Sequence, residues 1–200
     1  MPKIEELYRK TAVTQFFLGG AIFVIMWSSL DNFYSLQREV YADGKMVFLC
    51  LGISRVISLM FGVNHQIINI TKFYKFDTYS SLVLAIFTIL SNIIMIKYYG
   101  LEGAAIATAV SLVIFNIIRS YFLYNKLCIQ PFGRENVMVL LILLVGLGIG
   151  LIIPKLSNVF FDTAIRSSVI GVVMLILAIK FKVSKELTLF MSKISLKNYI

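Results

Sequence analysis

The sequence predicts an all-α integral membrane protein with six transmembrane helices, and three observations predict this class. Hydrophobic residues make up 59% of the 200 residues, only 14% are charged, and the mean hydropathy is +0.88. Soluble domains contain about a quarter charged residues. The apolar residues occur in blocks of about twenty, the length of a helix that crosses ~30 Å of hydrocarbon. The basic residues lie in short segments between these blocks, as the positive-inside rule expects.

Residues 1–11 form a short polar lead-in, and the first span is predicted over residues 12–30. Gly19 and Gly20 permit close approach of another helix, and Trp27 marks a membrane interface. Basic residues before an apolar run are also typical of a signal peptide. This run is longer than usual for one and is not followed by a small-residue cleavage site, so we expect the span to be retained.

The second predicted span, residues 46–70, carries the clearest functional signal. It is long enough to cross a bilayer as one helix, yet it contains an arginine well inside. At about 100° per residue, its polar and small residues fall in one stripe about 100° wide. The stripe consists of Arg55, Ser58, Gly62, His65, Gln66 and Asn69. A charge that faces lipid at the bilayer centre costs at least ~2.5 kcal/mol, so we expect the stripe to face other protein or a water-filled cavity.

The remaining spans are predicted over residues 80–96, 103–121, 137–153 and 164–179. Together with the first two they make residues 12–181 a membrane region of six helices. The run KYYGLEG predicts a tight turn between the third and fourth spans. Gly103, Ala107 and Ser111 recur at a spacing of four, which permits close helix packing. Chance in an alanine-rich helix explains that repeat equally well.

Residues 182–200 form a basic tail. Its apolar residues share one helical face: Val183, Leu187, Phe190, Met191 and Ile194. This pattern is typical of an amphipathic helix lying in the cytoplasmic interface, and a frayed polar tail is the alternative. If the N-terminus is inside and there are six spans, most of the 19 Lys and Arg residues lie on the inner side. We therefore expect both termini to be cytoplasmic.

Few features point to catalysis. The run VGLGIG at 145–150 has alternate glycines but lies inside a span without a preceding strand, so close helix packing or a kink explains it better than nucleotide binding. His65 is the only histidine and has no metal-ligating neighbour at suitable spacing. The acids near spans all fall at predicted turns: Asp31, Asp77, Glu102 and Asp162. We expect no enzyme, no cofactor, no metal and, despite the net charge of +9, no nucleic-acid partner.

Arg55 has two interpretations. It is either a structural arginine bonded to carbonyls of a neighbouring helix or a cation that lines a polar path and attracts an anionic group such as a phosphate. The hydroxyl, imidazole and amide groups beside it suit sugars or phosphates. Asn92 and Asn116, in the third and fourth spans, are further candidates for the same interior. The candidate substrate-path residues are Arg55, Ser58, His65, Gln66, Asn69, Asn92 and Asn116.

Residues 52–77 and 98–132 resemble the C-terminal half of bacterial polysaccharide flippases, and the resemblance covers most of the chain. These are the O-antigen and lipopolysaccharide translocases of the multidrug/oligosaccharidyl-lipid/polysaccharide exporter superfamily. In the first stretch the residues that carry the resemblance are Gly62, Asn64 and Gln66. In the second stretch they are Gly100, Gly103, Ala104, Ala105, Ala107 and Thr108, followed by Pro131 and Phe132.

The resemblance implies a lobe of a transporter that flips undecaprenyl-pyrophosphate-linked oligosaccharide across the bacterial inner membrane for lipopolysaccharide or polysaccharide biosynthesis. Such transporters work by alternating access, with two six-helix lobes around a polar cavity. The resemblance therefore also implies a partner, either the missing N-terminal lobe or a second copy of this chain.

Three alternatives remain. A drug/cation antiporter of the same superfamily would need an embedded acid. A membrane-bound polysaccharide polymerase or ligase would need large outer loops with clustered arginines or catalytic residues. A truncated, non-transporting membrane scaffold is consistent with the count of six spans.

Overall fold

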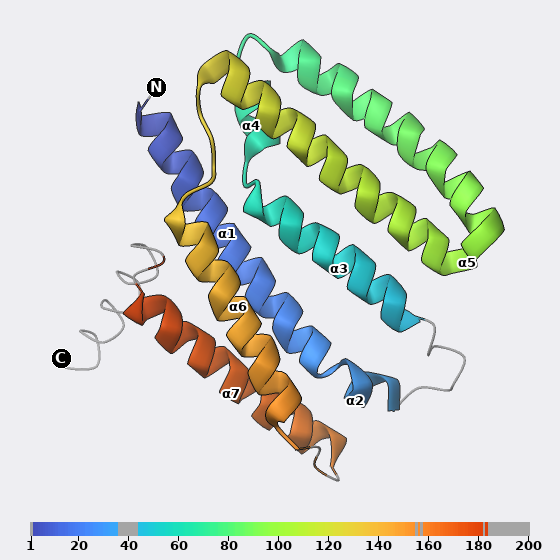
Figure 1. Ribbon diagram of the computed structural model, residues 1–200, viewed down its shortest axis with the longest axis vertical. Helices are drawn as coiled ribbons and strands as arrows, with labels where there is room; N and C mark the ends of the chain where they lie inside the picture. Colours follow the sequence, from blue (N-terminus) through green and yellow to red (C-terminus); the bar gives the residue numbers. More distant parts are fainter. Residues whose placement is uncertain (1, 36–43, 155, 157, 182, 184–200) are drawn as a thin grey trace.

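The computed structural model describes residues 2–35, 44–154, 156, 158–181 and 183. In these residues it contains helices and no strands (Figure 1). The helices are α1 (Pro2–Ser28), α2 (Leu30–Ser35), α3 (Gly44–Met60), α4 (Asn64–Asn69), α5 (Tyr74–Leu127), α6 (Arg134–Ile152) and α7 (Val159–Lys180). The predicted all-α class is confirmed for this part of the chain. The amphipathic tail predicted over residues 182–200 lies outside the described residues, apart from Val183, which is buried.

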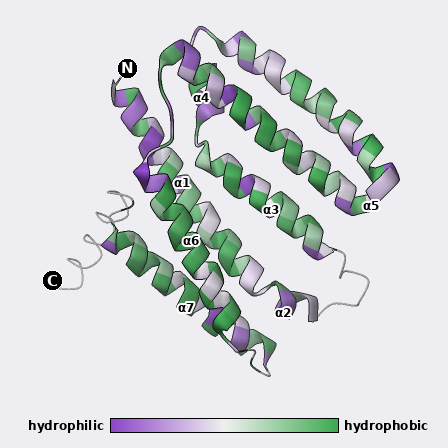
Figure 2. Ribbon diagram, viewed as in Figure 1, coloured by the Kyte–Doolittle hydropathy of each residue, from purple (hydrophilic) through white to green (hydrophobic). Residues whose placement is uncertain are grey.

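Among the described residues, α1, α5, α6 and α7 are long and apolar enough to cross a membrane. Figure 2 shows hydrophobic residues along most of these helices, with hydrophilic residues gathered near several helix ends and at α4. These four helices are compatible with the predicted class, a helical membrane protein. Each of the six predicted spans overlaps either one of the helices α1, α3, α6 and α7 or one arm of α5.

The 54-residue α5 is a hairpin of two helical arms. Its chain reverses at Gly100, whose φ of 58° and ψ of −141° belong to a region that residues with a side chain avoid. The tight turn predicted here is confirmed. Gly103 lets the arms approach closely, because a Cβ there would clash with the carbonyl of Met95. Ala107 and Ser111 are buried as well, so the spacing-four repeat has a packing role.

The helices α1, α6 and α7 share the larger apolar core. Its fully buried members include Phe17, Val139 and Ile170. Gly146 and Gly150 lie where α6 meets its neighbours, and a Cβ at either position would clash with a side chain of α7 or α1. Gly146 and Gly150 therefore serve close helix packing, as expected for this run, whereas a Cβ on Gly148 would meet no atom within 4 Å. In Figure 1 the α6–α7 pair and the α5 hairpin lie on opposite sides of α1 and α3.

The prediction of one continuous helix over residues 46–70 is wrong. Helix α3 ends at Met60, and α4 begins at Asn64 after a turn in which Gly62 has a φ of +62°. The turn packs against α1, so that a Cβ on Gly62 would lie 2.7 Å from the Cβ of Ala12. The hydroxyl of Tyr8, which is itself buried, donates to the carbonyl of Phe61 at 2.9 Å. Such a partner satisfies a carbonyl that the broken helix leaves free.

Candidate functional site

A polar cleft of about 440 Å³ lies between α1, α3, α4 and the second arm of α5. The side chains that characterise this polar cleft are Arg55, Ser58, His65, Gln66, Asn116 and Arg119. Although α3 and α4 are separate helices, stripe residues from both of them face the same space. The structure therefore brings most of the candidate substrate-path residues together, and it adds Gln15 from α1 and Arg119 from α5.

Amide and hydroxyl groups link three helices at this polar cleft. Asn116 in α5 donates from Nδ2 to Ser58 Oγ at 2.9 Å and accepts at Oδ1 from Asn64 Nδ2 at 3.3 Å. Ser58 Oγ in turn donates to the carbonyl of Ser54 at 2.8 Å. These bonds hold α3, α4 and α5 in register, so the neutral side of the cleft is preorganised. The hydroxyl of Ser58 therefore helps to join α3 to α5.

A buried carboxylate lies behind the cleft, at a residue that is not among the candidate site residues predicted from the sequence. The side chain of Asp77, only 3% exposed, has Oδ2 2.7 Å from His65 Nδ1 and Oδ1 3.1 Å from Arg119 Nε. Arg119 also donates from Nη2 to Ser81 Oγ at 2.8 Å. Asp77 and Arg119 lie on different arms of α5, at similar sequence distances from Gly100. That register, once the hairpin is recognised, is the signal that predicts their pairing.

Arg55 differs from Arg119 because its guanidinium is not committed. Its side chain is exposed, and within the described part of the chain it has no hydrogen bond or ion pair. This does not support the interpretation of Arg55 as a structural arginine bonded to a neighbouring helix. Arg55 also lines a second pocket of about 400 Å³, which continues along α3 toward Phe48 and Gly44. An exposed arginine between two pockets is available to an anionic ligand.

Asn69 and Asn92, the other two candidate residues, do not line the polar cleft. Asn69 lies on α4 beside the polar cleft, with its Nδ2 3.3 Å from His65 Nε2. Asn92 is in the first arm of α5 and exchanges hydrogen bonds of 3.3 Å with Thr108 in the second arm. It links the two arms of the hairpin and is not a lining residue of the polar cleft.

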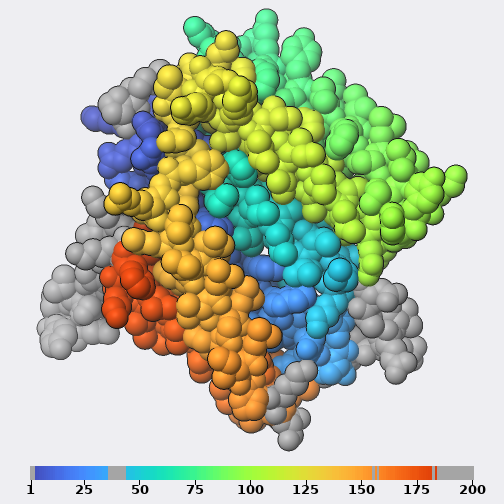
Figure 3. Space-filling view, viewed as in Figure 1, coloured from blue at the N-terminus to red at the C-terminus, as the bar shows by residue number. Residues whose placement is uncertain are grey.

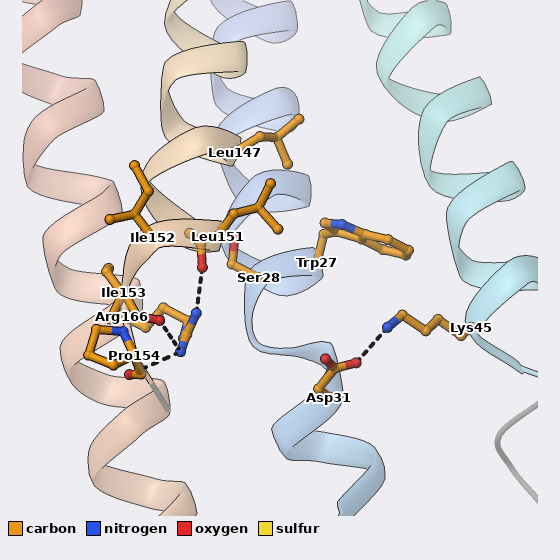
Figure 4. A pocket seen from close by; sticks show the side chains of 11 residues that line it. Trp27, Ser28, Asp31, Lys45, Leu147, Leu151, Ile152, Ile153, Pro154 and Arg166 are labelled. Carbon is orange, nitrogen blue, oxygen red and sulfur yellow. Dashed lines mark hydrogen bonds and ion pairs between the residues drawn. The ribbon is translucent and has the colours of Figure 1, made fainter. Parts of the chain in front are cut away.

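A second polar network closes the α6–α7 connection. Buried Arg166 donates to the carbonyls of Gly150 and Ile153 (Figure 4). It also pairs with Asp162 one turn earlier in α7. Asp162 also accepts a hydrogen bond from Asn32 of α2. Arg166 therefore caps the C-terminal end of α6 and has a structural role. The acids Asp77 and Asp162 lie in first helical turns, close to the predicted turns, but their carboxylates are buried and ion-paired.

The side chains of the polar cleft offer polar and charged contacts to a ligand. In the described residues, no group of three or more His, Cys, Asp or Glu side chains is placed to hold a metal ion. The cleft instead combines one uncommitted guanidinium with amide, hydroxyl and imidazole groups. Comparison with models of known families, with curated proteins and with solved structures finds no match to the chain. The geometry of the cleft is therefore the main evidence for what the protein does.

Proposed function

We propose that this chain is one lobe of a transporter that flips an anionic, lipid-linked oligosaccharide across the inner membrane of a bacterium. The observation that carries the proposal is the polar cleft itself. Polar residues of α3, α4 and α5 converge there in a chain whose helices are otherwise apolar, and Arg55 is left available for a ligand. The resemblance of residues 52–77 and 98–132 to polysaccharide flippases supports the same substrate class.

The groups in the cleft match the parts of such a substrate. A guanidinium binds phosphate oxygens through paired N–H donors, so Arg55 would bind the pyrophosphate. Gln66 offers a donor and an acceptor to sugar hydroxyls. The amide of Asn116 and the ring nitrogens of His65 already have partners within the protein, and they shape the polar wall of the cleft. In this proposal six elements cross the membrane, namely α1, α3, the two arms of α5, α6 and α7. A second lobe completes the cavity. That lobe is a copy of this chain, a different chain or another part of a longer protein.

The buried acid does not favour cation antiport. An antiporter needs a carboxylate that can exchange its counter-ion for a proton or a metal cation. Both oxygens of Asp77 already face cationic or polar nitrogens, those of Arg119 and His65. Asp77 is therefore placed to neutralise Arg119. A non-transporting scaffold remains the alternative that a negative transport experiment would support.

Restoration of surface polysaccharide in a flippase-deficient bacterium tests the proposal. The chain is expressed alone and together with the N-terminal six spans of a related flippase, and its presence in the membrane is verified by immunoblotting. Rescue by the chain alone would show that copies of it form a complete transporter. Rescue only with the added spans would make it one lobe of a two-part transporter. Failure of both, with the protein in the membrane, would overturn the proposal in favour of the scaffold.

In a strain that is rescued, Arg55→Ala should lower polysaccharide export about tenfold, because a charge-assisted contact to the anionic group is lost. Arg55→Lys should retain part of the activity, since it keeps the charge without the paired donors. Lys97→Ala is the matched control, because Lys97 is an exposed cation near the tip of the α5 hairpin. Wild-type export by Arg55→Ala at equal membrane abundance would remove Arg55 from the substrate path.

A further inference from the structure

Three aromatic side chains form a cluster of nearly parallel rings between α1 and α3, on the far side of Arg55 from the polar cleft. The rings of Phe23, Trp27 and Phe48 lie 5.9 to 6.4 Å apart between centroids, with interplanar angles of 11° to 25°. Because the planes are nearly parallel, the ring faces share one orientation. The separations exceed the 3.5–4.0 Å of direct carbon contact, so the rings are offset and leave part of their faces uncovered. We call these three rings the aromatic platform.

Gly52 leaves space for one ring of this platform. A Cβ on Gly52 would clash with the ring of Phe23, so the glycine allows that ring to lie against the backbone of α3. All three residues are half-buried, neither enclosed in the core nor fully exposed. The platform is therefore held in place by α3 and still has accessible ring surface.

Charged groups border the platform on one side. Lys45 Nζ lies 5.5 Å from the centroid of the Trp27 ring and 2.6 Å from Asp31 Oδ1. Both charged side chains are close to half exposed. Together with Trp27 and Ser28 they line a pocket of about 570 Å³, which is shown in Figure 4. Figure 3 shows α1, the helix that carries Trp27, in the space between α6 and α3.

We propose that the aromatic platform and its charged border form a binding subsite for a saccharide. One face of a pyranose ring presents C–H groups that pack on aromatic rings, while its edge carries hydroxyls that hydrogen-bond to carboxylate and ammonium groups. The platform and the Lys45–Asp31 pair offer both kinds of contact side by side. A hydrocarbon chain would gain nothing from the Lys45–Asp31 pair, and a free phosphate would gain nothing from the rings.

The position of the subsite relates it to Arg55. Phe48 precedes Arg55 by two helical turns on the same face of α3, about 10 Å along the axis. The pocket lined by Phe48, Gly52 and Arg55 connects the two positions. An elongated ligand with an anionic group at Arg55 would place sugar rings at the platform. Only this last step rests on the proposed function; the subsite itself does not.

Trp27 makes the test direct, because it is the only tryptophan in the chain. The full chain in phosphatidylcholine nanodiscs is titrated with free galactose, with N-acetylglucosamine and with a linear trisaccharide of each, while tryptophan emission is recorded. We expect a saturable change with the sugars, and half-saturation at lower concentration for the trisaccharides. Sorbitol, which has hydroxyls but no ring face, should give no saturable change.

Two variants locate the response. Lys45→Met and Phe48→Leu should each raise the half-saturating concentration about tenfold, the loss expected for a hydrogen bond to a charged group or for a stacking contact. Lys97→Met is the control and should bind like the wild type. Circular dichroism verifies that each variant is folded. An unchanged half-saturating concentration in both folded variants would overturn the proposal.

Other outcomes are equally decisive. Quenching of Trp27 by brominated acyl chains, without any response to saccharide, would make the platform a lipid-facing interface anchor and overturn the subsite. Saccharide binding without rescue of surface polysaccharide would refute the transport proposal and leave the subsite standing. Rescue without a saccharide response would refute the subsite and leave transport standing.

Discussion

Arg55, Arg119 and Arg166 show how the same residue type takes different roles inside apolar helices. Arg119 is paired with Asp77, and Arg166 is paired with Asp162 and bonded to backbone carbonyls. Both are consistent with the high cost of an uncompensated charge in a low-dielectric interior. Arg55 has no such partner in the described part of the chain, so its charge is the one that a ligand can use.

Replacement of Asp77 by Asn tests the buried pair. The guanidinium of Arg119, whose side chain is only 11% exposed, would lose its counter-ion. We expect the free energy of unfolding to fall by about 3 kcal/mol. The measurement is reversible denaturation in detergent micelles, followed by circular dichroism and by Trp27 emission.

Two further variants control for this effect. His65→Gln removes the other partner of Asp77. Because the side chain of His65 is 46% exposed, this variant should change the free energy of unfolding by less than ~1 kcal/mol. The double variant Asp77→Asn with Arg119→Met removes both buried charges and should recover part of the loss. Equal stabilities of Asp77→Asn and His65→Gln would contradict a structural role for the Asp77–Arg119 pair.

At the scale of helices, the break between α3 and α4 shapes the site. The turn at Gly62 packs against Ala12 of α1, and the hydroxyl of Tyr8 satisfies the carbonyl of Phe61. Interrupted helices place side chains and backbone groups from both segments around a polar cavity. Here the interruption separates Arg55 and Ser58 on α3 from His65 and Gln66 on α4, and all of them line one cleft.

Gly62→Ala tests the importance of this break. The substitution forces a left-handed backbone onto a residue with a side chain, at ~1–2 kcal/mol, and brings its Cβ against Ala12. Overpacking of that kind adds ~1–3 kcal/mol. We expect a total loss of about 3 kcal/mol in the unfolding free energy, measured in the same micelles.

Gly148→Ala is the matched control for this substitution. Gly148 lies within helix α6 and has nothing within 4 Å of an added Cβ. Because alanine has a higher helix propensity than glycine, this variant should be as stable as the wild type or more stable by up to ~1 kcal/mol. If the two alanine variants lose the same stability, the turn at Gly62 is not a packed and strained position.

At the scale of the whole molecule, the outward surface of the α5 hairpin is apolar. Its first arm exposes many large side chains, including Leu82, Ile86, Ile93 and Ile94. An apolar surface this extensive is unfavourable in water and favourable against lipid or a second lobe. The arrangement therefore agrees with a membrane protein whose polar groups face inward.

The native cysteines allow the topology to be measured. Cys128 is exposed after the second arm of α5, on the side where the charge distribution places the cytoplasm. In a Cys50→Ser background, a membrane-impermeant maleimide should label Cys128 only after spheroplasts are permeabilised. Lys97→Cys, made with both native cysteines replaced by Ser, should be labelled in intact spheroplasts. The reverse pattern would invert the predicted orientation.

The class of the protein follows from the sequence alone because burial of apolar surface is non-directional and roughly proportional to area. Blocks of twenty apolar residues predict helices in a membrane whatever their neighbours are. Local chemistry likewise predicts the reversal at Gly100 and the close packing at Gly103 and Gly146. The polar stripe on residues 46–70 identifies five of the eleven residues that line the polar cleft, since a charged side chain that faces lipid is costly.

The tertiary structure decides which polar residues are committed and which are available. The break at Gly62 depends on Ala12 and Tyr8, which are about 50 residues away in the chain. The pairing of Asp77 with Arg119 depends on the register of a hairpin. Helical periodicity describes one helix at a time, whereas a hydrogen bond or ion pair requires two groups within a few ångströms of each other. The composition of this chain therefore determines its membrane class, and only the packing of its helices leaves Arg55 available to a ligand.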